Sequence, residues 1–122
     1  MRNLKNLDVE TLMDLPSVAS YNSDWLSCTT LESERHLDDH EYSCREERWA
    51  TRLVKGGHLV CFDVSDDEAQ EHRLTLEDFK TGVEKCYEQI IGDVADFNNE
   101  HDDYDTCSNI MQVIVFGEVI YG

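Results

Sequence analysis

The stretch at residues 48–65, "RWATRLVKGGHLVCFDVS", decides the fold class that the sequence predicts. Two runs rich in β-branched, aromatic and aliphatic residues flank the pair Gly56-Gly57. Glycine adopts the positive φ angles of a tight hairpin turn without steric cost. Every second residue of the first run, at 49, 51 and 53, would lie on one face of a strand. The pattern predicts a central antiparallel Gly-Gly hairpin.

Further strands are predicted on both sides of this hairpin. Residues 25–31, "WLSCTTL", are rich in Thr and begin with a tryptophan, which is typical of a strand. Residues 71–76, "EHRLTL", follow the turn "SDDEAQ" and predict a strand that pairs back onto the hairpin. We therefore expect a small antiparallel sheet of three or four strands.

Helices are predicted from capping residues and apolar spacing. Thr75 with Asp78 forms a capping box before apolar residues at helical intervals, and Gly92 would end that helix. Gly82 lies inside it, and a close approach to another backbone is one reason for a glycine there. Asp8 would cap a short first helix that runs through Leu15, and Pro16 would end it.

A last helix would begin at Asp105 or Thr106 and end at Gly117, and "EVIY" after it would form an edge strand or fold back onto the core. The polar segment "SERHLDDHEYSCREE" at residues 33–47 fits a long loop or an exposed helix. The expected fold is α+β, with the sheet packed on two or three helices, in a single domain of residues 1–122.

Charge is the strongest compositional signal. The chain has 27 acidic and 10 basic residues, a formal net charge of -17, and residues 62–122 hold 16 of the acids but only 3 of the bases. Nucleic acids and anionic membranes are bound through clusters of Lys and Arg. The composition therefore argues against either as a direct partner and favours a cationic protein surface.

Cysteine usage and hydropathy indicate an intracellular compartment. The five cysteines are odd in number, widely spaced and without a CxxC pair. The first residues, "MRNLKNLDVETL", are too polar for a signal peptide, and no apolar run approaches the ~20 residues of a membrane span. We expect a reducing cytosol in which the thiols are mostly core residues. The sequence leaves open whether the protein forms a homodimer.

One group of side chains suggests a metal site. His36, His40 and Cys44 are spaced four residues apart, so a helix would place them on one side, and Cys28 could complete a tetrahedral zinc site. The alternative is that the histidines are exposed polar residues and the cysteines are unrelated. No cofactor is expected otherwise, and no motif supports catalysis.

The acidic residues themselves are the main candidate for function. Acids four residues apart on a helix repeat at ~6 Å, a regular line of charge that could imitate a nucleic-acid backbone. A solvated surface without a partner is the competing interpretation. The candidate partner-binding residues are Asp66, Asp67, Glu68, Glu77, Asp78, Glu84, Glu88, Asp96, Glu100, Asp102 and Asp103.

The C-terminal tail carries a family resemblance. With "LTLEDFKTGVEK" and the Gly-Gly segment before it, "DDYDTCSNIMQVIVFGEVIYG" resembles a group of small acidic proteins encoded by bacteriophages and prophages. The matching residues are Gly82, Asp102, Asp105, Thr106, Gln112, Phe116, Gly117, Glu118 and Tyr121. Residues 33–47 depart from the pattern.

The resemblance implies a context and no chemistry. It implies a phage product in the host cytoplasm, a setting in which small acidic proteins inhibit host defence, including as DNA mimics that block CRISPR effectors or nucleases. The expected function is a non-enzymatic inhibitor that binds a basic nucleic-acid-handling host protein or effector complex. The alternative is a zinc-stabilised adaptor without mimicry.

Overall fold

The computed structural model describes residues 2–21, 24–65, 67–101 and 103–121, and the fold is α+β, as predicted. Within these ranges, three strands form one open antiparallel sheet, and there are about six helices in place of the two or three expected. The elements are α1 (Val9–Ser20), β1 (Leu26–Thr29), the 3-10 helix η1 (Glu32–Leu37), α2 (Arg45–Val54), β2 (Leu59–Asp63), β3 (Gln70–Leu74), α3 (Leu76–Gln89), α4 (Ile91–Asn98) and α5 (Tyr104–Phe116).

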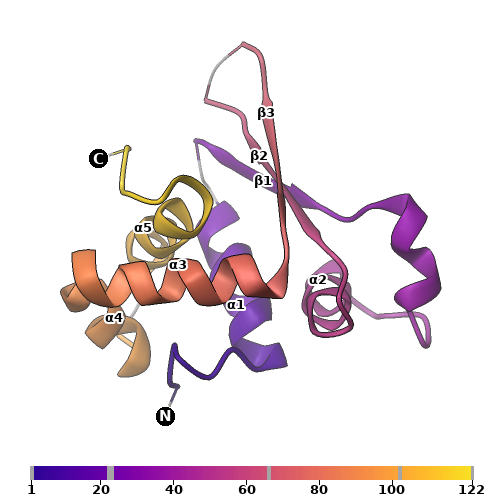
Figure 1. Ribbon diagram of the computed structural model, residues 1–122, viewed down its shortest axis with the longest axis horizontal. Coiled ribbons are helices and arrows are strands. Elements are labelled where there is room, and N and C mark those ends of the chain that lie inside the picture. The colour runs from indigo at the N-terminus through magenta and orange to yellow at the C-terminus, as the bar shows by residue number, and fades with distance from the viewer. Residues whose placement is uncertain (1, 22–23, 66, 102, 122) are drawn as a thin grey trace.

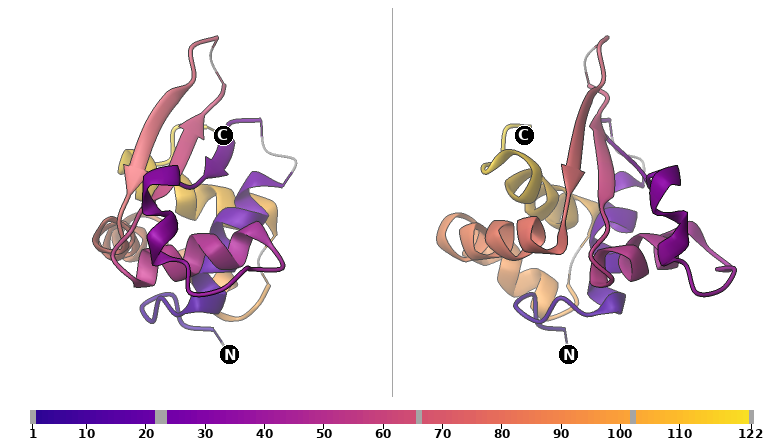
Figure 2. Two further views of the ribbon diagram at one scale, coloured as in Figure 1. Left: turned by 90° about the vertical axis from the view of Figure 1, so that its right-hand side faces the viewer. Right: turned by 45° about the vertical axis from the view of Figure 1, so that its right-hand side comes forward.

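The sheet has the order β1-β2-β3, and both pairings are antiparallel. Figure 1 shows the β2–β3 hairpin extending beyond the helices, with α3, α4 and α5 on one side of it and α2 and η1 on the other; the right-hand view of Figure 2 agrees. Strands β1 and β3 occupy the positions predicted from residues 25–31 and 71–76.

The predicted Gly-Gly hairpin is wrong. Residues 45–54 form α2, and the residues that would alternate on a strand instead follow helical spacing, with Trp49 and Leu53 both buried one turn apart. Gly56 has a φ of 90°, which fits a residue just past the end of a helix as well as it fits a turn. The glycine pair therefore ends α2 and leads into β2.

Two predicted helix ends are also wrong. Pro16 lies inside α1, which continues to Ser20 because Leu12, Leu15 and Ala19 form a fully buried stripe along it. That burial outweighs the ~3 kcal/mol that an internal proline costs. Gly92 does not end α3 but lies in α4, which follows after Ile90.

The caps were predicted with more success. The Asp8 side chain accepts from Thr11 N, and Thr75 and Asp78 form the reciprocal capping box at the start of α3. The start of α5 is capped by Asp103, not by Asp105 or Thr106 as expected. Gly117 ends α5 with a φ of 84°, as predicted.

Helix α5 forms the centre of the hydrophobic core. Seven of its thirteen residues are buried, and α1, α3 and α4 all pack against it. The contact with α3 is very close, because a Cβ added to Gly82 would lie 2.6 Å from the Cα of Ile114. The predicted reason for the glycine, an approach between two backbones, is confirmed.

We predict that Gly82→Ala lowers the free energy of unfolding by about 3 kcal/mol, because the new methyl group would push α3 away from the α5 backbone. Gly92→Ala is the matched control: nothing lies within 4 Å of its added Cβ. In a helix this change should raise stability by about 0.5 kcal/mol. Urea denaturation of both variants checks the prediction, which fails if Gly82→Ala is neutral.

The undecided segment at residues 33–47 folds as η1 and a loop that a buried arginine holds in place. Arg52 is 2% exposed; its Nε and Nη2 donate to the Asp38 carboxylate at 2.9 and 3.0 Å, and Nη1 donates to the Leu31 carbonyl. The hydrogen bond from Arg52 and the nearby charge of Arg48 lower the pKa of Asp38. Since these residues come from three segments, one guanidinium joins α2 to the η1 region.

We predict that Arg52→Met lowers the free energy of unfolding by about 3 kcal/mol at neutral pH, because it removes one partner of a buried pair. A lowered folded-state pKa means that Asp38 contributes stability above its ordinary value of 3.8, and that this is lost as pH falls through the folded pKa. The difference in the free energy of unfolding between the wild type and Arg52→Met should therefore become smaller at acidic pH. Arg35→Met, at an exposed pair with Glu32, should change stability by less than about 0.5 kcal/mol.

Candidate functional site

The predicted partner-binding acids lie at three separate places. Asp66 and Asp102 fall outside the described residues. Asp67 and Glu68 are exposed at the tip of the β2–β3 hairpin, which projects away from the helices (Figure 1). The other seven lie on α3 (Glu77, Asp78, Glu84, Glu88) and around the junction of α4 and α5 (Asp96, Glu100, Asp103).

The acids of α3 are partly compensated. Lys80 is 4.0 Å from Glu77, and Lys5 from the N-terminal segment joins Lys80 in lining a shallow hollow with Glu84 and Glu88. The Asp78 carboxylate accepts from Thr75 N and so belongs to the helix cap. Lysines therefore interrupt the expected line of charge on this helix.

The junction of α4 and α5, here called the acidic corner (residues 93–105), lacks such compensation along the chain. The last basic residue of the sequence is Lys85, and the 37 residues after it contain eight acids and no Lys or Arg. Burial raises the pKa of Asp93, and the charges of Asp96 and Asp103 raise it further. These carboxylates are thus close enough to repel one another.

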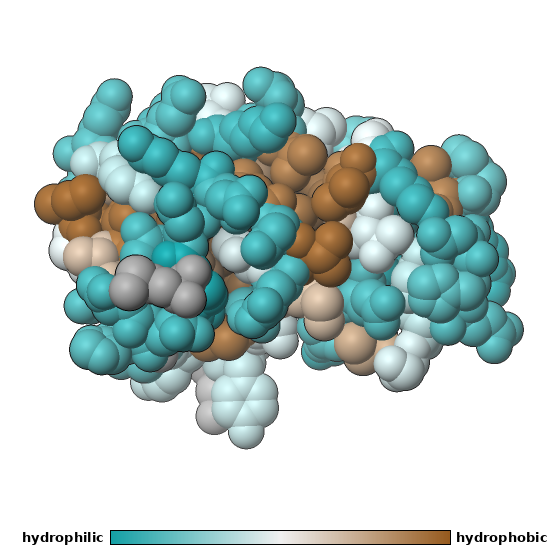
Figure 3. Space-filling model, turned by 90° about the horizontal axis from the view of Figure 1, so that it is seen from below, coloured by the Kyte–Doolittle hydropathy of each residue, from teal (hydrophilic) through white to brown (hydrophobic). Residues whose placement is uncertain are grey.

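The face seen from below is mostly hydrophilic, with hydrophobic residues showing near its centre and at one edge (Figure 3). The N-terminal segment lies on this side of the molecule and contacts α4. Arg2 from this segment lies over the Phe97 ring and is 3.6 Å from Asp14. This arginine therefore adds one cation beside the corner, while Asp96, Glu100, Asp103 and Asp105 stay exposed.

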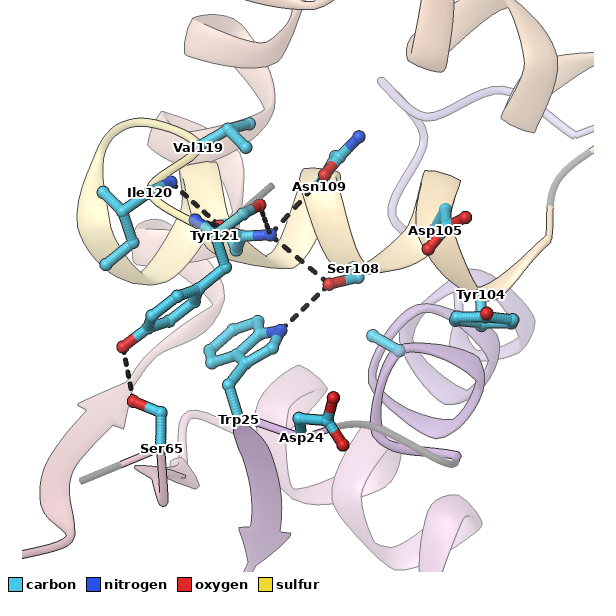
Figure 4. Close-up of a pocket in the computed structure, with 12 residues that line it drawn as sticks. Asp24, Trp25, Ser65, Tyr104, Asp105, Ser108, Asn109, Val119, Ile120 and Tyr121 are labelled. Atoms are coloured by element: carbon cyan, nitrogen blue, oxygen red, sulfur yellow. Dashed lines mark hydrogen bonds between the residues drawn. The ribbon is translucent and has the colours of Figure 1, made fainter. Parts of the chain in front are cut away.

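A groove of about 810 Å³ adjoins the acidic corner at the first turn of α5. Tyr104 and Asp105 line it from α5, Asp24 and Trp25 from the segment leading into β1, and residues 119–121 from the C-terminal tail (Figure 4). Among the described residues, twelve line it, and these include two carboxylates, three aromatic rings and no Lys or Arg. Tyr104, Val119 and Ile120 are exposed, so the groove combines accessible apolar surface with negative charge.

A buried amide helps to hold the C-terminal tail at the groove. Gln112 is 1% exposed within the apolar stripe of α5, and its Oε1 accepts from Ile120 N at 2.9 Å and Tyr121 N at 2.7 Å. The "EVIY" segment therefore folds back onto the core, one of the two predicted alternatives. Buried polar groups of this kind are retained when their hydrogen bonds are made.

Hydrogen bonds and rings fix the wall of the groove. Trp25 Nε1 donates to Ser108 Oγ at 2.9 Å, and the Trp25 ring packs against Phe116 and Tyr121. Tyr121 Oη donates to Asp63 Oδ2 at 2.6 Å and lies 2.6 Å from Ser65 Oγ. Burial raises the pKa of Asp63, but the hydrogen bonds from Tyr121 and Ser65 outweigh it and hold that pKa below the ordinary value.

The predicted zinc site is not assembled. Within the described ranges, no three His, Cys, Asp or Glu side chains gather in a way that could hold a metal ion. Cys28 Sγ lies 3.7 Å from Cys61 Sγ on the sheet, and His40 Nδ1 lies 2.6 Å from Asp39 Oδ1. His36 lies on η1 and Cys44 precedes α2, both exposed. The spacing assumed one helix across residues 36–44, and that helix is absent from this stretch.

The groove could not be predicted from the sequence. Its aromatic residues come from segments far apart in the chain, so no local motif joins them. One signal was present: Gln112 is a lone amide in an otherwise apolar helix stripe, which indicates that a backbone segment must supply its hydrogen bonds.

Comparisons with known proteins give no relatives. No family model, curated protein or solved structure matches this chain. None of the helices in the described parts of the chain has the length and apolar character needed to cross a bilayer.

We predict that Tyr121→Phe raises the pKa of Asp63 and lowers the free energy of unfolding by about 1 kcal/mol at neutral pH. Because the folded-state pKa of Asp63 is lowered, this contribution exists above 3.8 and is lost as pH falls through the folded pKa. Urea denaturation as a function of pH and an NMR titration of Asp63 check this. Tyr104→Phe, at an exposed ring, is the control and should change neither quantity measurably. An unshifted Asp63 in Tyr121→Phe would contradict the prediction.

Proposed function

We propose that the protein is a non-enzymatic inhibitor that binds a basic, nucleic-acid-handling protein through its acidic corner and the adjoining groove. The observation that carries the proposal is the run of eight acids without a Lys or Arg after Lys85, which the fold gathers mainly around α4 and the start of α5. Like charges held together raise the free energy of the isolated protein, and a cationic partner relieves that repulsion.

The pKa of Asp93 supports this choice of surface. Burial and the charges of Asp96 and Asp103 make its ionised form less favourable in the free protein. A partner that brings Lys or Arg to the corner would favour ionisation again, so binding should be accompanied by a lowered pKa of Asp93. The acids of α3 are weaker candidates because lysines lie beside them. The acids of the hairpin tip are weaker candidates because they lie far from the acidic corner.

The groove supplies the apolar part of such an interface. Asp24 and Asp105 could pair with a basic side chain whose aliphatic stem or guanidinium plane packs on the Trp25 and Tyr104 rings. Charge at a rim gives fast, salt-sensitive association, while a side chain anchored in a pocket slows dissociation. An arginine of the partner, which can pair with carboxylates and stack on rings, fits this combination best.

The partner class follows from the same chemistry. A basic protein surface that binds phosphates also accepts clustered carboxylates, so the partner class is a nuclease, a CRISPR effector or another nucleic-acid-binding protein. Because the C-terminal tail resembles phage and prophage proteins, the proposed setting is the host cytoplasm, where the protein would act against host defence. The zinc-stabilised adaptor has no support from the arrangement of its four residues.

The test compares two charge reversals. We predict that Asp96→Lys/Glu100→Lys weakens binding roughly tenfold or more and reduces its dependence on ionic strength, because it removes charge from the acidic corner. The partner is first captured from bacterial lysate on the immobilised protein and purified. Its affinity for each variant, and its displacement from a labelled DNA duplex, are then measured at several salt concentrations.

Asp67→Lys/Glu68→Lys is the matched control, since it changes the net charge equally at the hairpin tip. Its affinity should stay within roughly twofold of the wild type. Melting temperature and circular dichroism establish that both variants fold. Equal losses in the two variants would show that only total charge matters, and failure of the partner to leave DNA would exclude mimicry.

A further inference from the structure

The sheet contains two thiols directly opposite each other. Cys28 on β1 pairs with Cys61 on β2, and their Sγ atoms are 3.7 Å apart without being bonded. The Cys61 side chain is fully buried, whereas that of Cys28 is only partly buried. This pair takes no part in the groove or the acidic corner.

The hydrogen-bond pattern defines the type of pairing at these residues. Val64 N donates to the Trp25 carbonyl at 2.7 Å, which marks 25 and 64 as a hydrogen-bonded pair continuing the β1–β2 register. Pair types alternate along an antiparallel ladder, so 27 and 62 form the next hydrogen-bonded pair, and Cys28 and Cys61 form a non-hydrogen-bonded pair. Opposed Cα atoms at such a pair are ~4.5 Å apart, inside the ~4.4–6.8 Å range of protein disulfides.

We propose that Cys28 and Cys61 are an oxidation site, a dithiol that closes to a cross-strand disulfide and fixes β1 to β2. The sulfurs need to approach from 3.7 Å to about 2.05 Å, a movement within reach of side-chain rotation and a small shift of an edge strand. The disulfide would hold β1 against β2. Because β1 begins one residue after Trp25, it would also hold the Trp25 wall of the groove in place. The inference does not depend on the proposed function.

The reaction is a two-step exchange with a small disulfide such as oxidised glutathione. The Cys28 thiolate attacks one glutathione sulfur, which breaks the glutathione S–S bond and releases one glutathione thiolate. The Cys61 thiolate then attacks Cys28 Sγ, forming the protein disulfide and releasing the second glutathione. The two electrons leave the cysteine pair for glutathione, and the two thiol protons end on the released glutathione molecules.

Accessibility sets the order of these steps. Cys28 is the more exposed thiol and reacts first. The hydrogen bond with Cys28 and burial both raise the pKa of Cys61, so its thiolate is scarce at neutral pH and the second step should accelerate as pH rises. Burial raises the pKa of Cys86 and Cys107, which lie on α3 and α5, to about 12 and leaves them unreactive. Cys44 is exposed and is the competing thiol.

The experiment uses the full chain with Cys44→Ser, incubated with oxidised glutathione at neutral and mildly alkaline pH. We expect peptide mapping without reductant to recover one cross-linked pair, Cys28 with Cys61, formed faster at the higher pH. The melting temperature should rise by about 10 °C relative to the reduced form and return on reduction, because a loop of this length is closed. Hydrogen exchange of the backbone amides in β1 should also be slower in the oxidised form than in the reduced form.

Two further variants keep the test decisive. In the Cys44→Ser background, Cys61→Ala should trap glutathione on Cys28 with no rise in melting temperature, and Cys28→Ser should leave Cys61 unmodified. If either variant fails to fold, the other carries the control. Recovery of Cys28 only as its glutathione adduct in the chain that retains Cys61 would overturn the proposal, and so would a cross-link that leaves β1 exchange unchanged.

Discussion

The contact between α3 and α5 at Gly82 is the constraint on which the rest of this structure depends. Because the α3 backbone lies directly on Ile114, the two helices are as close as a glycine allows. Helices α1 and α4 also pack against α5, so that seven of its thirteen residues are buried. A helix held so closely fixes both ends of the candidate site: its first turn carries Tyr104 and Asp105, and its end turns the tail back at Gly117.

The sequence predicted the parts of the fold that local chemistry controls. The capping box at Thr75, the cap at Asp8, the end of α5 at Gly117 and the reason for Gly82 all depend on a few neighbouring residues or on one steric rule. Helix α2 could not be recognised this way, because Trp49 and Leu53 fit a strand face or a helix face and the glycine pair fits either continuation. The choice was made by tertiary burial, including that of Arg52 against Asp38.

The candidate site, like the fold, has features that the sequence predicts and features that depend on tertiary contacts. Total charge and its bias toward the second half of the chain could be read from composition, and so could the candidate acids. Their distribution could not, since lysines from elsewhere on α3 and from the N-terminal segment approach some carboxylates and leave others exposed. The zinc hypothesis failed for a related reason: the neighbour of Cys28 is Cys61 on the adjacent strand β2, thirty-three residues away in the chain.

Gln112 joins the C-terminal tail to α5, next to the rings that line the groove. The groove that this amide and the rings of Trp25 and Tyr121 help to form is lined by residues 19, 24–25, 65, 104–105, 108–109, 112 and 119–121. Such a concave surface exists only when every contributing segment has reached its native place, so it is absent from any partly unfolded form. Ligand binding in the groove and cooperative folding are therefore thermodynamically linked. A bound ligand would protect the whole chain against unfolding and proteolysis, and not only the residues that it contacts.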